Sequence, residues 1–360
     1  MAEQKLLVKR EGDFHYPIYF KNDFQDLAGA IREEGLENRK ICIVTDSHVA
    51  PLYHEAVKSA LQEISSEIFS FVFEAGEKNK NLNTVQELYK TLIENEMDRK
   101  GLLVALGGGV VGDLTGFGAS TYLRGIDFIQ VPTTLLAQVD SSVGGKTGVD
   151  FLQYKNMVGA FHQPRLVYMN MSTLQSLPNR EFTCGMGEIL KTGLICDEEF
   201  FRFVCKNQPE ISKLDLSMLS RMIRRCCEIK AERDPKEQGE RALLNLGHTV
   251  GHAVEKMKNF QLLHGQCVGV GLIAAAYLSM QRGLLTEEEY EEIRKGCHSY
   301  NLPLSVDSLN AGDVLAATKK DKKMKAGHIK FILMDGIGKS FIDKTVTDEE
   351  LLQAIREILI

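Results

Sequence analysis

Three histidines and one glutamate have the residue types and spacing of a metal site. His248 and His252 are four residues apart in LGHTVGH, so they share one face if this segment is helical. His264 follows in HGQ, and Glu188 stands earlier in GMGEILK. Two histidines and a carboxylate suit a catalytic zinc ion with an open coordination position. Each histidine could instead be structural, and Glu188 could instead form a salt bridge with Lys191 at the next helical turn.

A glycine-rich segment in the first half has the pattern of a dinucleotide-binding turn. Residues 107–113, GGGVVGD, follow an apolar stretch and precede a helical pattern. Read as GxGxxG, they would bring backbone N–H groups to a pyrophosphate at a helix N-terminus. Asp46, at the end of an earlier predicted strand, suits a ribose hydroxyl, and Glu77 and Lys80 lie in a polar segment after the next strand. The alternative is a tight strand-to-helix turn without a ligand.

A second glycine-rich segment, DSSVGGKTG at 140–148, ends like a phosphate-binding P-loop. The P-loop interpretation fails, because the first glycine of that motif would fall at Asp140. We therefore expect a glycine-rich loop that presents Lys146, with Lys155 and Asn156 shortly after it. A flexible surface loop with solvated lysines is the alternative. The histidine pair is also not HExxH, since residue 249 is threonine, which disfavours a zincin protease.

Basic residues complete the candidate site: Arg124, Lys230, Arg241 and the pair Lys322–Lys323. Arg241 and Asn245 are four residues apart just before His248, so we expect them to face the same way as that histidine. Charged helix faces that simply meet water are the alternative.

Composition limits the classes of function. The chain has 360 residues, a net charge of −6, 44% hydrophobic and 26% charged residues, which is typical of a globular protein without general attraction to nucleic acid or anionic membranes. Basic residues within an acidic protein favour a small anionic substrate. The first residues contain no apolar signal-peptide core, and the longest apolar run, 267–280, is too short to span a membrane. The eight cysteines form no CxxC pair, so we expect reduced thiols and a cytoplasmic location.

Hydrophobic periodicity divides the chain into two parts. In the first part, predicted strands alternate with predicted helices, which indicates an α/β domain with a parallel sheet covered on both faces. The strands are expected at 16–20, 40–45, 68–73, 102–106, 128–131 and 166–169, and the helices at 24–34, 50–62 and 83–95. The second part is mostly helical, with helices at 182–194, 215–232, 248–258, 268–282, 287–299 and 349–359 and one extended segment at 329–334. A proline near 176–179 places the boundary, giving domains 1–177 and 178–360 with a ligand cleft expected between them.

These motifs resemble those of the 3-dehydroquinate synthase family within the sugar phosphate cyclases. The similar segments are GGGVVGDLTGF, YLRGIDFIQVPTTLLAQVDSSVGGKTGV, KNMVGAFHQP, GMGEILKTGLI, RALLNLGHTVGHAVE, HGQCVGVG and DKK, in the family's order. The resemblance implies a Rossmann-like N-terminal domain that binds NAD and a helical C-terminal domain that binds metal and substrate. It also implies zinc or cobalt on Glu188, His248 and His264, with His252 free of the metal and near the substrate phosphate.

The resemblance also assigns the other ligand-binding residues. It implies that NAD is bound by Asp46, Glu77, Lys80, Gly109, Val110, Val111, Gly112, Asp113, Thr133, Thr134, Lys146, Lys155, Thr173 and Ser176. It implies that the substrate is bound by Asp140, Lys146, Asn156, Lys191, Lys230, Arg241, Asn245, His252 and the 322–323 lysine pair. Arg124 is expected to reach the substrate of a second subunit, which implies a homodimer. The sequence departs from the family's usual residues at Asp150, His162, Gly187 and Thr192, none of which is an implied ligand.

The implied reaction converts 3-deoxy-D-arabino-heptulosonate 7-phosphate to 3-dehydroquinate and phosphate in the shikimate pathway, with NAD regenerated in each turnover. Two enzyme alternatives remain at this point: a related cyclase that makes an inosose or valiolone, and a polyol dehydrogenase on the same fold. Lys230, Arg241 and Asn245 suit a substrate carboxylate and disfavour the first, and the basic phosphate-binding set disfavours the second. A protein that only binds ligands would not need a metal site and a dinucleotide site together.

Overall fold

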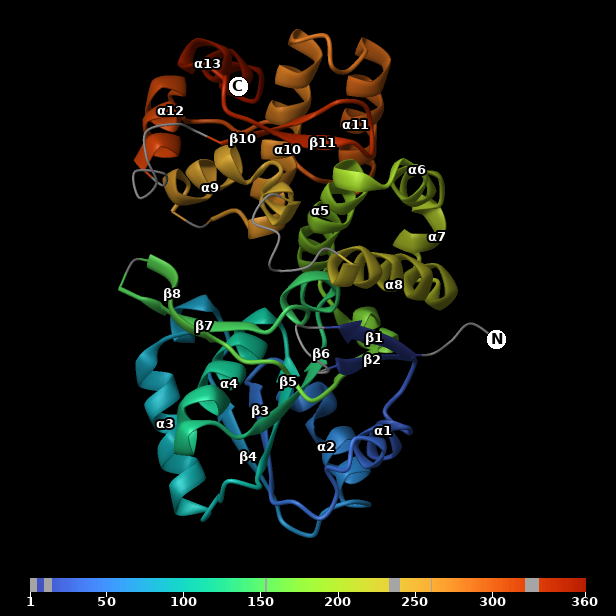
Figure 1. Ribbon diagram of the computed structural model, residues 1–360, viewed down its shortest axis with the longest axis vertical. Coiled ribbons are helices and arrows are strands. Elements are labelled where there is room, and N and C mark those ends of the chain that lie inside the picture. Colours follow the sequence, from blue (N-terminus) through green and yellow to red (C-terminus); the bar gives the residue numbers. More distant parts are fainter. Residues whose placement is uncertain (1–4, 10–14, 153, 233–239, 260, 321–329) are drawn as a thin grey trace. The chain divides into compact units, whose positions relative to one another are not determined.

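The chain folds into two compact units, residues Met1–Leu177 and Pro178–Ile360. A computed structural model describes residues 5–9, 15–152, 154–232, 240–259, 261–320 and 330–360 (Figure 1). Each unit is described by itself below. In the described part of the chain, none of the helices combines the length and apolar character that a membrane span requires.

The first unit is built on a seven-stranded sheet in the order β1-β2-β9-β6-β5-β3-β4. β1 pairs with β2 in antiparallel fashion, and the other neighbours are parallel. The strands are β1 (Lys5–Lys9), β2 (His15–Lys21), β3 (Ile41–Asp46), β4 (Ile68–Phe73), β5 (Leu102–Gly107), β6 (Asp127–Pro132) and β9 (Val167–Asn170). The predicted parallel α/β class is confirmed, whereas β1 was not predicted.

Helices cover both faces of this sheet, because the central strands are apolar on both sides. Ile41 and Ile43 of β3 pack with α1 (Leu27–Glu33) and α2 (Ala50–Leu61) on one face. The alternate residues Cys42 and Val44 pack with α3 (Leu82–Glu94) and α4 (Gly109–Thr121) on the other. Both layers are visible in Figure 1. Continuous burial along β3 is what a strand inside a parallel sheet requires.

The strand order reverses direction between β3 and β5. After β3 the chain adds β4 on one side, then crosses back to add β5, β6 and β9 on the other. The carboxyl ends of parallel strands meet at one edge, and the point of reversal leaves a crevice there in which α/β proteins bind ligands. Asp46 ends β3 and Gly107 ends β5, so both predicted nucleotide motifs flank this point.

A hairpin of two strands that were not predicted begins at the end of the glycine-rich segment 140–148. β7 (Lys146–Phe151) and β8 (Tyr154–Phe161) pair in antiparallel fashion and pack against α4. Gly116 of α4 permits this packing, because a Cβ there would lie 2.3 Å from Thr147 Cγ2. The loop predicted at 140–148 is wrong for residues 146–148, which belong to β7, because glycine content indicated flexibility, whereas Gly148 and Gly159 allow close backbone packing within the hairpin.

The second unit is mainly helical, as predicted. Its helices are α5 (Asn179–Cys196), α6 (Glu198–Lys206), α7 (Gln208–Ser212), α8 (Leu216–Glu232), α9 (His248–Met257), α10 (His264–Gln281), α11 (Glu287–Ser299), α12 (Ala311–Lys320) and α13 (Asp348–Glu357). A hairpin of β10 (Phe331–Met334) and β11 (Ser340–Asp343) accompanies them, and only its first strand was predicted. The apolar run 267–280 lies within the buried helix α10, which begins one turn earlier than predicted, at His264.

Glycines let α5 and α9 approach α10 at backbone distance. A Cβ on Gly187 of α5 would lie 2.3 Å from the Gly265 carbonyl oxygen. A Cβ on Gly271 of α10 would lie 1.9 Å from the carbonyl oxygen of Gly247, just before α9. Gly247 itself has a φ of +77°, a left-handed conformation that glycine adopts without strain. These contacts fix the positions of the helices that carry Glu188, His248 and His264.

Gly271→Ala tests this packing. The added methyl meets backbone rather than a movable side chain, so we expect a loss of about 1–3 kcal/mol in the free energy of unfolding, measured by urea denaturation followed by circular dichroism. Gly29→Ala is the matched control, because Gly29 lies in α1 with open space around it. It should gain up to about 1 kcal/mol from helix propensity. Equal stability of the two variants would contradict the packing argument.

Candidate functional site

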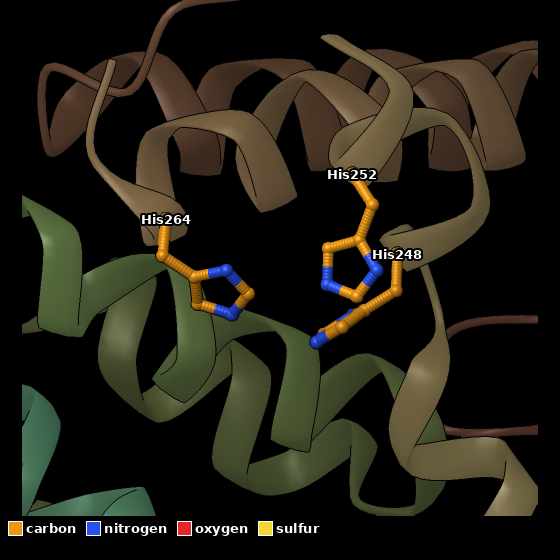
Figure 2. A group of neighbouring side chains, drawn as sticks. All are labelled: His248, His252 and His264. Atoms are coloured by element: carbon orange, nitrogen blue, oxygen red, sulfur yellow. The ribbon is translucent and has the colours of Figure 1, made fainter. Parts of the chain in front are cut away.

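The candidate metal ligands come from three helices of the second unit. Glu188 lies in the middle of α5, His248 begins α9, and His264 begins α10. His252 follows one turn after His248, and ligand atoms of the three histidines all lie within 4.8 Å of one another. Figure 2 shows the three imidazole rings turned toward a common space. The spacing read from the sequence therefore corresponds to a real cluster.

Glu188 has one carboxylate oxygen paired and the other directed at the histidines. Oε2 forms an ion pair with the Lys191 ammonium, which was the alternative role considered for Glu188. Oε1 lies 3.3 Å from His264 Nε2 and 3.9 Å from His248 Nε2. It is buried, and no hydrogen-bond partner for it exists among the described residues. The salt bridge thus accounts for one oxygen only.

The outer nitrogens of two imidazoles are held by hydrogen bonds. His248 Nδ1 lies 3.1 Å from the Leu246 carbonyl oxygen, which only accepts, so Nδ1 carries the proton. His264 Nδ1 lies 3.4 Å from Oε2 of Glu255. In both rings Nε2 is left for the inner space. Metal-binding histidines are oriented in this way by carbonyl or carboxylate partners.

Charge and burial set the protonation of this cluster. Burial alone would raise the pKa of Glu188, but Lys191 and the two histidines lower it well below its usual value. Burial, reinforced by Lys191, lowers the pKa of His248 to about 3, so this ring is neutral as a ligand must be. Burial also opposes charge on His264, but contacts with Glu188 and Glu255 raise its pKa to about 10. A metal ion bound here would displace that proton.

This donor set fits a zinc or cobalt ion. Glu188 Oε1 faces two imidazole nitrogens, which is the three-ligand set of a catalytic site with an open position. His252 belongs to the same cluster, and its expected separation from the metal stays a prediction.

The glycine-rich motif forms the start of α4, and residues 109–113 are helical rather than a loop. Its glycines permit a tight turn and close packing of the helix against the sheet, as a dinucleotide-binding turn requires. A Cβ on Gly107 would lie 2.5 Å from Val111, and one on Gly112 would lie 2.7 Å from Gln130 Oε1 of β6. The helix is capped by Gly108, which has no side chain to occupy the first N–H groups. Those donors suit a phosphate.

Other predicted cofactor residues lie at or just after the carboxyl ends of strands β3, β6 and β9. Asp46 ends β3, and its Oδ1 accepts the backbone N–H groups of His48 and Val49 at 2.9 Å each. Thr133 and Thr134 follow β6, and the buried Thr133 hydroxyl has no hydrogen-bond partner among the described residues. Thr173 and Ser176 follow β9 in a 3₁₀ segment.

Lys80 joins the cofactor motif to the hairpin. Its buried ammonium donates to Asp113 Oδ2 at 2.7 Å and to Asn156 Oδ1 at 2.6 Å. The Lys80 carbonyl accepts the Asp150 N–H at 2.8 Å, and Asp150 Oδ1 accepts the Asn156 N–H at 2.8 Å. Burial alone would lower the pKa of Lys80, but the negative charges of Asp113 and Glu77 raise it. The structure therefore brings predicted cofactor and substrate residues into one network.

The other predicted ligand-binding residues of the first unit lie on its turns and on the hairpin. Glu77 and Lys155 form a long ion pair at 3.9 Å. Lys146 is exposed at the start of β7. Asp140 lies in a short π-helical turn, Ala137–Ser141, a feature that recurs at functional sites. Arg124 is exposed in a turn in which Leu123 and Arg124 both have positive φ, 49° and 70°.

Other predicted substrate residues lie on α8 and on the segment that precedes α9. Lys230 lies half-buried in the last turn of α8. Arg241 and Asn245 lie in a 3₁₀ segment, Glu240–Asn245, in which a four-residue spacing does not by itself put two residues on one face, and their common direction stays a prediction. Asn245 is exposed, and the Arg241 side chain lies outside the described part. Lys322 and Lys323 also lie outside the described residues.

The sequence reasoning missed two residues of this site. Asp150 was noted only as a departure from the family's usual residue, yet its carboxylate accepts a hydrogen bond from the backbone N–H of Asn156. Glu255 was overlooked, yet it contacts His264. Glu255 stands seven residues after His248, which is two helical turns on the same face, and this signal was present in the sequence.

Solved structures share this whole architecture. One is 2-deoxy-scyllo-inosose synthase complexed with carbaglucose-6-phosphate, NAD⁺ and Co²⁺ (TM-score 0.88, 24% identity, 99% of this chain and 100% of that chain). Another is 2-epi-5-epi-valiolone synthase from Streptomyces hygroscopicus with NAD⁺ and Zn²⁺ bound (TM-score 0.88, 28% identity, 98% of each chain). The fold is therefore that of the sugar phosphate cyclases. An iron-containing alcohol dehydrogenase has the same fold, with a TM-score of 0.66 and 14% identity.

Sequence comparison gives the particular family, and the chain belongs to the 3-dehydroquinate synthase family. Models of the 3-dehydroquinate synthase N-terminal and C-terminal parts match residues 70–184 and 185–324. The 3-dehydroquinate synthase of Acetivibrio thermocellus is 42% identical over 95% of this chain and 96% of its own. That of Nitrosomonas europaea is 45% identical over 89% of this chain and 88% of its own. The predicted resemblance is confirmed.

The Lys80 network gives a prediction about stability. Lys80→Met removes the partner of a largely buried carboxylate, Asp113, so we expect a loss of about 3 kcal/mol in the free energy of unfolding, measured by urea denaturation. Asp113→Asn in the Lys80→Met background removes the stranded charge and should recover much of this loss. Additive losses in the double variant would contradict the coupling.

Proposed function

We propose that this chain is a 3-dehydroquinate synthase, a phosphate-eliminating lyase that converts 3-deoxy-D-arabino-heptulosonate 7-phosphate to 3-dehydroquinate and phosphate. This reaction belongs to the shikimate pathway toward chorismate and aromatic amino acids. Membership of the family supports the assignment. The observation in the structure that carries it is Glu188 Oε1, a buried carboxylate oxygen that faces two histidine Nε2 atoms and has no hydrogen-bond partner among the described residues.

The proposed cofactors are NAD and a zinc or cobalt ion. Glu188, His248 and His264 would hold the ion. When bound, NAD⁺ would take a hydride from the substrate and return it, and the ion would polarise the oxygen at the reacting carbon. The sheet edge would hold NAD, with the first N–H groups of α4 at the pyrophosphate and Asp46 at a ribose hydroxyl. Glu77, Thr133, Thr134, Thr173, Ser176 and Lys155 complete the proposed set.

The substrate would be bound by cations that match its carboxylate and phosphate. Lys191 is already fixed beside Glu188 by their ion pair, so it can donate to a substrate oxygen near the metal without reorganising. His252, beside the proposed ligands, would bind the phosphate and stabilise its charge as it leaves. Asn156, held by Lys80, would orient the substrate. Asp140, Lys146, Lys230, Arg241, Asn245 and the 322–323 lysine pair are the remaining proposed contacts.

A homodimer in the cytoplasm is part of this proposal. Arg124 is exposed on a turn of two consecutive left-handed residues, a backbone conformation that costs about 1–3 kcal/mol per residue and is typically retained for function. It would reach the substrate of the second subunit. All eight cysteines are free, which suits a reducing compartment.

The experiment that tests the function measures phosphate and NADH together. With zinc present and heptulosonate phosphate in large excess over NAD⁺, phosphate should exceed the supplied NAD⁺ many times, while absorbance of free NADH stays flat. This follows because the cofactor is regenerated in each turnover. NADH that accumulates in proportion to substrate consumed would instead indicate a polyol dehydrogenase. Turnover with glucose 6-phosphate and none with the heptulosonate would indicate a cyclase of the inosose type.

Single-residue variants test the proposed ligands through metal content. Glu188→Gln and His248→Ala should each lose most of the zinc retained after gel filtration, measured by mass spectrometry of the metal, because each removes one of three protein ligands. His252→Ala should retain wild-type zinc and lose phosphate release. Zinc lost in the His252 variant and kept in the Glu188 variant would exclude this ligand set.

A further inference from the structure

Glu255 is a buried carboxylate on the face of α9 that carries the candidate metal ligand. It stands two helical turns after His248, and its residue is only 5% exposed. A buried carboxylate costs free energy unless hydrogen bonds and opposite charge compensate it. The position of Glu255 along α9 brings it to the start of α10, where His264 lies.

The His264 ring lies between two carboxylates. Its Nε2 is 3.3 Å from Glu188 Oε1, and its Nδ1 is 3.4 Å from Glu255 Oε2. The two nitrogens are therefore directed to opposite partners, one from α5 and one from α9. His264 is the first residue of α10. The next residue, Gly265, packs closely against α5, since a Cβ on Gly265 would lie 1.8 Å from the Cys184 carbonyl oxygen, and this contact fixes the backbone position of His264.

The two candidate histidine ligands differ in their outer partners. His248 Nδ1 meets a neutral carbonyl oxygen, that of Leu246, whereas His264 Nδ1 meets a carboxylate. A carboxylate partner makes the opposite ring nitrogen a stronger ligand than a carbonyl partner does. Removal of the Glu255 carboxylate should therefore weaken the binding of the metal ion by His264.

We propose that Glu255 is a positioning residue for the metal centre, which orients the His264 ring and keeps the proton on Nδ1, so that Nε2 binds the ion. This rests on the metal site proposed above. Glu255 does not contact the ion in this proposal. It acts through His264, and its loss should change both the affinity for the ion and the geometry around it.

The test uses the full-length protein with Zn²⁺ and Co²⁺ as probes. Zinc affinity is measured by competition with a chromophoric chelator, and ligand geometry by the visible absorption of the Co²⁺ form. Glu255→Ala should weaken zinc binding about 10–100-fold, the usual effect of removing such a partner, and should alter the Co²⁺ spectrum. Glu255→Gln keeps the shape and an accepting oxygen but lacks the charge, so a smaller loss is expected.

Glu350→Gln is the matched control. It removes a carboxylate of the same unit that pairs with Arg282 at 2.8 Å, away from the candidate ligands. Its zinc affinity and Co²⁺ spectrum should equal those of the wild type. If Glu255→Ala does not fold, Glu255→Gln decides alone, because it preserves volume and hydrogen bonding.

Two results would overturn the inference, and they are distinguishable. Wild-type zinc affinity and an unchanged Co²⁺ spectrum in both Glu255 variants would show that Glu255 has no role at the metal, while the proposed ligands stand. Absence of zinc binding in the wild-type protein would remove the metal site and this role together.

Discussion

The candidate site depends on one constraint, an ionised carboxylate that is held inside the protein. Only 4% of the Glu188 side chain is exposed, so its charge must be balanced by nearby cations or by a metal ion. Lys191 balances one oxygen, and the other faces two imidazole nitrogens. In the part of the chain that the structure describes, that second oxygen has no hydrogen-bond partner, and a buried acceptor without one costs free energy. A cation bound between Glu188 Oε1 and the two imidazole nitrogens would balance this charge, and α5, α9 and α10 bring these atoms together.

Backbone contacts between helices keep this arrangement rigid. Glycines at 187, 265 and 271 bring α5, α10 and the start of α9 together where side chains would hold them apart. Metal ligands must converge within a few tenths of an ångström, and rigid helices achieve this better than loops. In the first unit the parallel sheet plays the same part, because it delivers the ends of β3 and β5 to one edge. Lys80 then ties the helix that follows β5 to the hairpin that carries Asn156.

Long, periodic segments and motif residues could be predicted from the sequence, whereas contacts between distant segments could not. Apart from β1, the strands of the central sheet follow directly from hydrophobic spacing, as do the helices α5, α9 and α11. The β7–β8 hairpin was not predicted, and the loop predicted at 140–148 includes the first residues of β7, because glycines there indicate mobility unless the packing partner, α4, is known. The spacing of Arg241 and Asn245 predicted one helical face, whereas the segment is a 3₁₀ helix that ends at Asn245, two residues before the left-handed Gly247, so the common face stays a prediction. The role of Asp150 depends on the Lys80 segment, far away in sequence, which no local pattern reveals.

X-ray absorption at the zinc edge tests the central claim most directly, because it reports the atoms bound to the ion itself. The account predicts two imidazole nitrogens and oxygen ligands at about 2.0–2.2 Å in the zinc-loaded protein, with the same imidazole count in His252→Ala. Three imidazoles in the wild type, falling to two in His252→Ala, would contradict it and would place His252 on the metal in place of Glu188.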